Sequence, residues 1–100
     1  MSILDFSQRE MKKNPDHTSV REIVVGNKHV EIVEYEENAS HSDWCIAGHI
    51  GFVLDGEIMY ELEDGELRIL KGKGFLLPSG TRHRGHNVFP GITRFFLVDE

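Results

Sequence analysis

Short apolar or alternating runs, separated by turn residues, make up the chain from Val20 onward. Ile58, Tyr60 and Leu62 fall on one face of an extended segment, and glutamates fall on the other. This alternation is typical of a half-buried β-strand. Similar runs lie at residues 20–25, 30–35, 52–54, 67–69, 75–77 and 92–98. About seven or eight short strands, with turn signals every eight to twelve residues or so, predict an all-β fold, a small antiparallel β-barrel or jelly roll.

Glycine-containing dipeptides separate several of these runs. Gly26-Asn27 lies between the first two runs, Asp55-Gly56 follows Leu54, and Asp64-Gly65 ends the run from Glu57 to Glu63. Two-residue hairpin turns require positive φ, which glycine adopts without steric cost. We therefore predict β-hairpins at Gly26-Asn27 and at Asp55-Gly56, with a similar turn at Asp64-Gly65. The run at residues 75–77 is expected to be buried.

The first part of the chain does not show this pattern of apolar runs and turns. Residues 1–19 are polar and poorly periodic, and Ser7 and Glu10 have the spacing of a helix capping box. Pro15 would stop a helix that begins there. We therefore expect an N-terminal tail or one short helix over residues 1–19. Residues 20–100 would form a single barrel domain, because 100 residues suffice for one domain and not for two.

Charge and composition narrow the class of partner. Eleven Lys and Arg against seventeen Asp and Glu leave a formal net charge of −6, and the basic residues are scattered. This argues against nucleic acid or an anionic membrane as partner. The opening residues lack the apolar core of a signal peptide, and no later stretch is apolar enough to span a bilayer. We expect a cytoplasmic protein. A domain of this size buries only about two-thirds of its unfolded surface, so a homodimer is also expected.

Residues 72–87, GKGFLLPSGTRHRGHN, follow the pattern G-x5-P-x-G-x2-H-x3-N without exception. This segment resembles the second conserved motif of the cupin superfamily, with its specified positions filled by Gly72, Pro78, Gly80, His83 and Asn87. Pro78 restricts φ, Gly80 suits a tight turn, and His83 then begins the next strand. The resemblance implies a small cupin barrel in which His83 is a metal ligand. Without it, His83 could equally be a histidine hydrogen-bonded in a turn.

The first cupin motif ends in a ligand carboxylate followed by six residues and a glycine. That glycine corresponds to Gly56, and the carboxylate position holds His49. The two family histidines precede the carboxylate by three or four residues. The shorter gap places them at Asp43 and Cys45, and the longer gap at Ser42 and Trp44, which are not ligands. The resemblance thus implies a variant metal site made by Asp43, Cys45, His49 and His83. The glycine that opens this motif is replaced by Glu37.

Imidazole, thiolate and carboxylate ligands together suit a divalent transition metal. Zinc and iron are favoured, nickel and copper follow, and magnesium and calcium suit the set less well. A lone cysteine such as Cys45 is otherwise a small buried apolar residue. His41 and His86 are interpreted as surface residues or as neighbours of the site. Four aromatic residues could line a ligand cavity or belong to the core, namely Trp44, Phe52, Tyr60 and Phe75.

Two functions from different classes agree with these residues. One is a metal-dependent enzyme that acts on a small polar molecule by Lewis-acid or dioxygen chemistry. The other is a non-catalytic module that binds or senses a small ligand and uses its metal for stability. A closed site with four protein ligands favours the second function, and three ligands with an open position favour the first. Asp43 is the ligand that an open site would lack.

Overall fold

The computed structural model describes residues 3–99. Within these residues the chain forms nine β-strands and one short 3-10 turn, η1 (Phe6–Gln8). The strands are β1 (Lys12–Lys13), β2 (Thr18–Val25), β3 (Lys28–Tyr35), β4 (His49–Asp55), β5 (Glu57–Leu62), β6 (Gly65–Leu70), β7 (Gly74–Leu77), β8 (His83–Asn87) and β9 (Thr93–Asp99). No helix of the described part has the length and apolarity that a membrane crossing requires.

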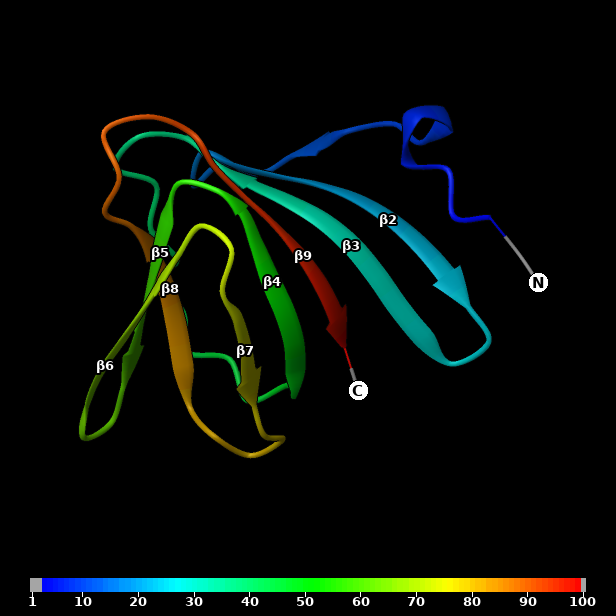
Figure 1. Ribbon diagram of the computed structural model, residues 1–100. Helices are drawn as coiled ribbons and strands as arrows, with labels where there is room; N and C mark the ends of the chain where they lie inside the picture. The colour runs from blue at the N-terminus through cyan, green and yellow to red at the C-terminus, as the bar shows by residue number, and fades with distance from the viewer. Residues whose placement is uncertain (1–2, 100) are drawn as a thin grey trace.

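The strands form two antiparallel sheets that face each other. The larger sheet has the order β1-β2-β3-β9-β4-β7, and the smaller has the order β6-β5-β8. In Figure 1 the smaller sheet lies at the left and the larger sheet curves down the right side. Strands far apart in the chain are neighbours, since β9 is inserted between β3 and β4. The prediction of an all-β antiparallel barrel or jelly roll is confirmed.

Alternating residues of both sheets meet between the layers and form the core. On β5, Ile58 is fully buried and Tyr60 is 4 % exposed, as the alternation predicted. On β7, Phe75 and Leu77 are buried whereas Leu76 is 59 % exposed. The expectation of a continuously buried run was therefore wrong at Leu76. The reason is that β7 is an edge strand of the larger sheet and contributes only one of its faces to the core.

Two of the three glycine dipeptides join hairpin strands. The Gly26-Asn27 hairpin is confirmed, since Val25 pairs with Lys28 across it. In the β5–β6 hairpin Leu62 pairs with Gly65, so Glu63 and Asp64 form the loop and Gly65 is the first residue of the next strand. The turn therefore lies one residue earlier than the dipeptide predicted.

The hairpin predicted at Asp55-Gly56 is wrong. β4 pairs with β7 and β9, whereas β5 pairs with β6 and β8. Asp55-Gly56 therefore carries the chain from the larger sheet to the smaller one. Gly56 has a φ of +82°, and a Cβ added there would lie 2.4 Å from Oγ1 of Thr93. Glycine thus meets two requirements of this corner, a positive φ and a close approach to β9.

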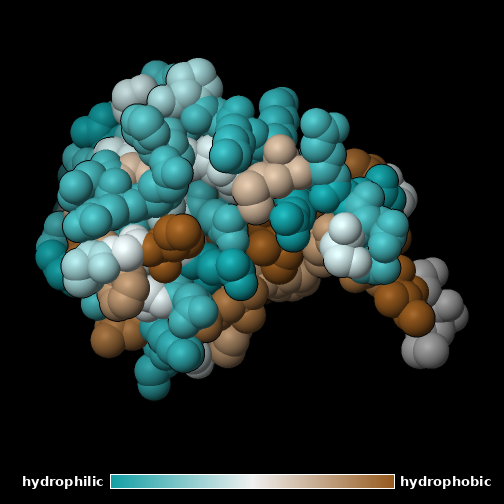
Figure 2. Space-filling model, turned by 90° about the horizontal axis from the view of Figure 1, so that it is seen from above, coloured by the Kyte–Doolittle hydropathy of each residue, from teal (hydrophilic) through white to brown (hydrophobic). Residues whose placement is uncertain are grey.

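The N-terminal part reaches the outer face of the larger sheet. Asp5 caps η1 by accepting a hydrogen bond from the Ser7 backbone, so Ser7 lies inside the turn. Phe6 packs edge-to-face on Phe96 of β9, with ring centroids 6.4 Å apart. Figure 2 shows hydrophilic side chains over most of the face that is seen from above. The division of the chain at residue 20 stays a prediction.

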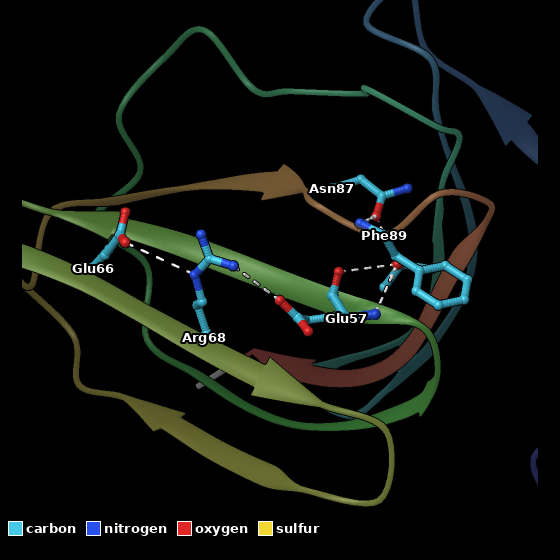
Figure 3. A network of polar contacts seen from close by, with 6 residues as sticks. Glu57, Glu66, Arg68, Asn87 and Phe89 are labelled. Carbon is cyan, nitrogen blue, oxygen red and sulfur yellow. Dashed lines mark hydrogen bonds and ion pairs between the residues drawn. The ribbon is translucent and has the colours of Figure 1, made fainter.

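Asn87 fixes the bend that follows β8. Its amide nitrogen donates hydrogen bonds to the carbonyl oxygens of Tyr35, Glu36 and Gly91. Its Oδ1 accepts hydrogen bonds from the Phe89 backbone and from the Thr93 hydroxyl. The Thr93 hydroxyl in turn accepts from the backbone of Glu57, and Figure 3 shows these groups gathered where β5 begins. Asn87, on β8 of the smaller sheet, thus connects the two sheets through hydrogen bonds to β3 and β9 of the larger sheet.

Candidate metal centre

Cys45, His49 and His83 bring one ligand atom each to a common point. These three atoms lie within 4.8 Å of one another. Cys45 Sγ is 4.0 Å from His49 Nε2, and the two imidazole centroids are 4.9 Å apart. The group lies at the lower end of the barrel in Figure 1, where β4 and β8 begin and β9 ends. His49 and His83 are both buried and Cys45 is half-buried.

Different elements hold the three residues. Cys45 and His83 form an isolated antiparallel bridge in which each backbone N–H donates to the other's carbonyl, at 2.8 and 2.9 Å. His49 instead begins β4 in the larger sheet. The chain therefore leaves β8 and enters the opposite sheet between Cys45 and His49. Cys45 and His49 do not lie on one continuous strand, because the residues between them are not in a strand.

The Nε2 atom of His83 carries no hydrogen and lies near the ligand atoms of Cys45 and His49. Its Nδ1 lies 2.8 Å from the Thr81 carbonyl oxygen, which can only accept, so Nδ1 carries the proton. Nε2 consequently has a free lone pair, and this buried atom has no hydrogen-bond partner among the described residues. Burial lowers the pKa of His83, which keeps the ring neutral. A buried nitrogen without a partner is costly, and a metal ion would satisfy it. The residues present therefore fit a metal.

His49 is oriented in the same sense by a carboxylate. Its Nδ1 is 2.7 Å from Oδ1 of Asp99, so the ring donates its Nδ1 proton and leaves the Nε2 lone pair toward Cys45. Metal-binding histidines in proteins commonly donate their second N–H to a carboxylate in this way. Two imidazole lone pairs and one sulfur thus converge. Asp43 is exposed and lies outside the group. It stays a predicted ligand.

A cavity of about 210 Å³ opens beside these three residues. Its apolar walls come from Val20, Val33, Tyr60, Phe95 and Leu97. Its polar walls include Glu31, Tyr35, His41 and Arg84. The mixture of a largely apolar lining and a few polar groups is typical of a small-molecule site.

Two polar residues of this region were not anticipated. Asp99, near the end of the described chain, orients His49, and Glu31 on β3 faces the cavity. Burial, together with the nearby charges of Asp99 and Glu22, raises the pKa of Glu31 to about 7. The sequence pattern could have pointed to Glu31, because it has the same parity as Val33 and Tyr35. This parity places its carboxyl group on a buried strand face. No local pattern marked Asp99 as the partner of His49.

The remaining histidine candidates lie around the group. His41 lines the cavity and stacks on Tyr35 with ring centroids 5.2 Å apart, and burial lowers its pKa. Its Nε2 lies 3.4 Å from a carboxylate oxygen of Asp16. His86 lies outside the metal group, where it contacts Ser40 and is 3.0 Å from Oε2 of Glu61. Both residues agree with their interpretation as surface residues or neighbours of the site.

The aromatic candidates divide into three groups. Tyr60 is buried and lines the cavity, and Phe75 is buried in the core. Trp44 lies against the guanidinium groups of Arg82 and Arg84, 4.8 and 4.3 Å from the ring centroid. Phe52 is 43 % exposed on the outer face of the larger sheet, so it belongs to neither the cavity nor the core. Its parity on β4 is opposite to that of the buried Val53.

The fold is shared with solved structures of low sequence identity. The cupin domain of Schizosaccharomyces pombe Cnp3 superposes with a TM-score of 0.80 at 13 % identity, covering 95 % of this chain and 70 % of that one. A predicted oxalate decarboxylase from Thermotoga maritima gives 0.82 at 12 % identity, covering 98 % and 97 %. The FeII form of HppE gives 0.82 at 15 % identity, covering 100 % and 60 %.

At these identities the structural matches show the fold alone. No curated protein sequence matches the chain. The family model for the cupin domain matches residues 28–99, which span all strands from β3 to β9. With the barrel and the second motif described above, this match shows that the chain belongs to the cupin family.

Proposed function

We propose that this cupin binds a divalent transition metal, zinc or iron, through Cys45, His49 and His83. The observation that carries the proposal is the buried Nε2 of His83, which has no hydrogen-bond partner among the described residues and lies beside His49 Nε2 and Cys45 Sγ. Asp43, the fourth predicted ligand, is exposed and lies outside this group, so our proposal assigns the ion three protein ligands. Such a set leaves a coordination position for a small polar molecule in the adjoining cavity.

Each residue has a definite part in this site. His49 and His83 offer neutral Nε2 atoms, because Asp99 and the Thr81 carbonyl hold their Nδ1 protons. Cys45 binds as the thiolate, which a coordinated cation keeps deprotonated. The apolar walls of the cavity limit the access of water to a bound molecule. When bound, the ion supplies a Lewis acid for a substrate oxygen or a site for dioxygen chemistry.

A non-catalytic role is the second candidate, and one observation favours it. Cys45 is bridged to β8 of the smaller sheet, while His49 belongs to the larger sheet. A metal ion would therefore crosslink the two sheets and stabilise the barrel. In that case the cavity binds or senses a small ligand without turnover.

The decisive experiment is elemental analysis of protein purified without chelator, combined with alkylation of Cys45. We expect about one zinc or iron ion per chain and a thiol that is protected until the metal is removed. His83→Gln should lose both the metal and the protection. His86→Gln, on the same strand but outside the group, is the matched control and should keep both. A metal-free wild-type protein with an equally reactive thiol at all times would refute the site.

Thermal melts and activity assays separate the two candidate functions. Removal of a structural metal should lower the melting temperature strongly, and remetallation should restore it without creating an activity. Turnover of a small polar molecule by remetallated wild type, absent in His83→Gln, would establish the enzyme and contradict the non-catalytic role.

Location and assembly are also proposed. A cytoplasmic location would keep the single Cys45 reduced and able to bind metal. The net charge of −6 supports a small molecule rather than nucleic acid or a membrane as partner. A homodimer is supported by apolar side chains on the outer face of the larger sheet, where Ile50 and Leu76 are cross-strand neighbours that are 51 % and 59 % exposed.

A further inference from the structure

Glu31 lies across the cavity from the metal group. It shares the inner face of β3 with Val33 and Tyr35, and it lines the same cavity as Cys45, His49 and His83. On the larger sheet β9 separates β3 from β4, so Glu31 and His49 are two strands apart. Glu31 is level with Gly51, two residues along β4 from His49, so two strand spacings and this offset together amount to about 12 Å. A molecule of a few heavy atoms bound at the metal group would therefore reach toward the Glu31 side chain.

Glu31 differs from the other carboxyl groups around it. Glu22 contacts His29 at 2.9 Å, Asp99 contacts His49 at 2.7 Å, and Glu61 pairs with Arg84. Glu31 has no hydrogen bond or ion pair with any described residue. The half-buried carboxyl group is thus free to interact with the contents of the cavity.

The surrounding charges disfavour the ionised form of this carboxyl group. Glu22 on β2 and Asp99 on β9 add negative charge, and His29 on β3 is already engaged with Glu22. On the opposite wall Arg84 is held by Glu61 and burial keeps His41 neutral. Burial and the two carboxylates raise the pKa of Glu31 to about 7. This raised pKa favours the neutral form of Glu31, which can donate a hydrogen bond.

We propose that the cavity takes a small carboxylate ligand, held at the Cys45–His49–His83 group, to which the neutral form of Glu31 donates a hydrogen bond. The inference rests on the proposed metal site. Two neutral imidazoles and one thiolate leave a divalent ion with positive charge, which favours an anion beside it. Neutral Glu31 would be a hydrogen-bond donor to that anion, and a charged acceptor strengthens such a bond. Ionised Glu31 would repel the anion. Ligand binding and Glu31 protonation are therefore coupled.

Cobalt-loaded protein offers a test that needs no enzymatic activity. The visible spectrum of the bound cobalt reports metal binding. Changes in this spectrum, followed between pH 6 and 8.5, report the binding of formate and of malonate. For wild type we expect carboxylate affinity to fall as the pH rises through the titration of Glu31, by up to about tenfold per unit above its midpoint. Glu31→Gln should remove this part of the pH dependence and keep the higher affinity. Glu34→Gln is the matched control, since Glu34 lies on the same strand and pairs with Arg94 at 2.7 Å.

The outcomes separate this inference from the proposed function. Absence of cobalt binding by wild type would refute the metal site itself. Cobalt binding without any response to formate or malonate would overturn the carboxylate inference alone, as would identical pH profiles for wild type and Glu31→Gln. A second measurement uses the wild type alone, so it does not depend on whether Glu31→Gln folds. In zinc-loaded wild type, the carbon-13 shift of the Glu31 carboxyl group should follow its titration, and malonate should raise the midpoint of that titration. An unchanged midpoint would also overturn the inference.

Discussion

The Asp99 carboxylate lies 2.7 Å from Nδ1 of His49, although the two residues are 50 positions apart in the chain. They are cross-strand partners, since β9 and β4 are adjacent in the larger sheet. The carboxylate can only accept a hydrogen bond, so it selects the His49 tautomer whose Nε2 is bare. One contact between two strands thereby sets the direction of an imidazole lone pair in the proposed metal site.

Asp99→Asn should weaken metal binding by about 10- to 100-fold, because the amide no longer enforces the His49 tautomer. Competition with a chromophoric chelator measures the affinity, and nitrogen-15 shifts of the ring report the tautomer. Asp55→Asn is a suitable control, since Asp55 is exposed and pairs with Lys71. Equal affinities for wild type and Asp99→Asn would show that Asp99 does not position His49.

Asn87→Ala should destabilise the fold by about 3 kcal/mol, because the substitution removes a buried side chain together with the hydrogen bonds that it makes to three carbonyl groups. The amide of Asn87 serves three such groups, on Tyr35, Glu36 and Gly91. Urea unfolding gives the free-energy change. Asn27→Ala, in the exposed β2–β3 turn, should change it little by comparison. Similar losses for both variants would contradict the role assigned to the Asn87 network.

Gly56→Ala and Gly72→Ala form a pair that separates steric contact from backbone conformation. Both glycines have positive φ, +82° and +85°, but a Cβ would clash with Thr93 at Gly56 and meets nothing within 4 Å at Gly72. We expect a loss of about 1 kcal/mol for Gly72→Ala and about 3 kcal/mol for Gly56→Ala. Chemical denaturation checks both values. Equal losses would mean that backbone conformation alone requires glycine at the corner.

Glu61 gives the barrel a pH-dependent contribution to stability. Its hydrogen bonds with Arg84 and His86 lower its pKa from 4.5 to about 2. Since the folded-state pKa is lower than the unfolded one, the stabilisation is present above about pH 4.5 and is lost as the pH falls toward 2. Wild type should therefore be more stable than Glu61→Gln at pH 7, and the difference should vanish near pH 2. A difference that is independent of pH would contradict this assignment.

Phe52→Glu should dissociate the proposed homodimer. Phe52 is 43 % exposed on the face that also carries Ile50 and Leu76, and a charge buried there in an interface would be costly. Sedimentation equilibrium measures the change in mass. Leu67→Glu, at an exposed position of the smaller sheet, is the control and should leave the mass unchanged. A wild type that is monomeric at all concentrations would refute the homodimer.

Much of the fold could be predicted from local patterns. The alternation around Ile58 and Tyr60 identified β5 and its buried face, and Gly26-Asn27 identified a hairpin. The second motif singled out His83 and Asn87. The structure places His83 in the candidate metal group and Asn87 in the network that connects the two sheets. These features depend on residues close in sequence, where strand period and turn conformation are dictated by local sterics.

The tertiary structure decided the rest. Asp55-Gly56 has the sequence of a hairpin turn, yet Gly56 turns a corner between sheets because β9 and β7 occupy both edges of β4. Cys45 and His49 meet His83 only because the chain crosses from one sheet to the other between them. The sequence by itself determined most of the strands and the buried face of β5, and it singled out His83 as a candidate ligand. Which strands pair is a non-local outcome of packing, and it alone brought Asp99 to His49 and Glu31 to the same cavity.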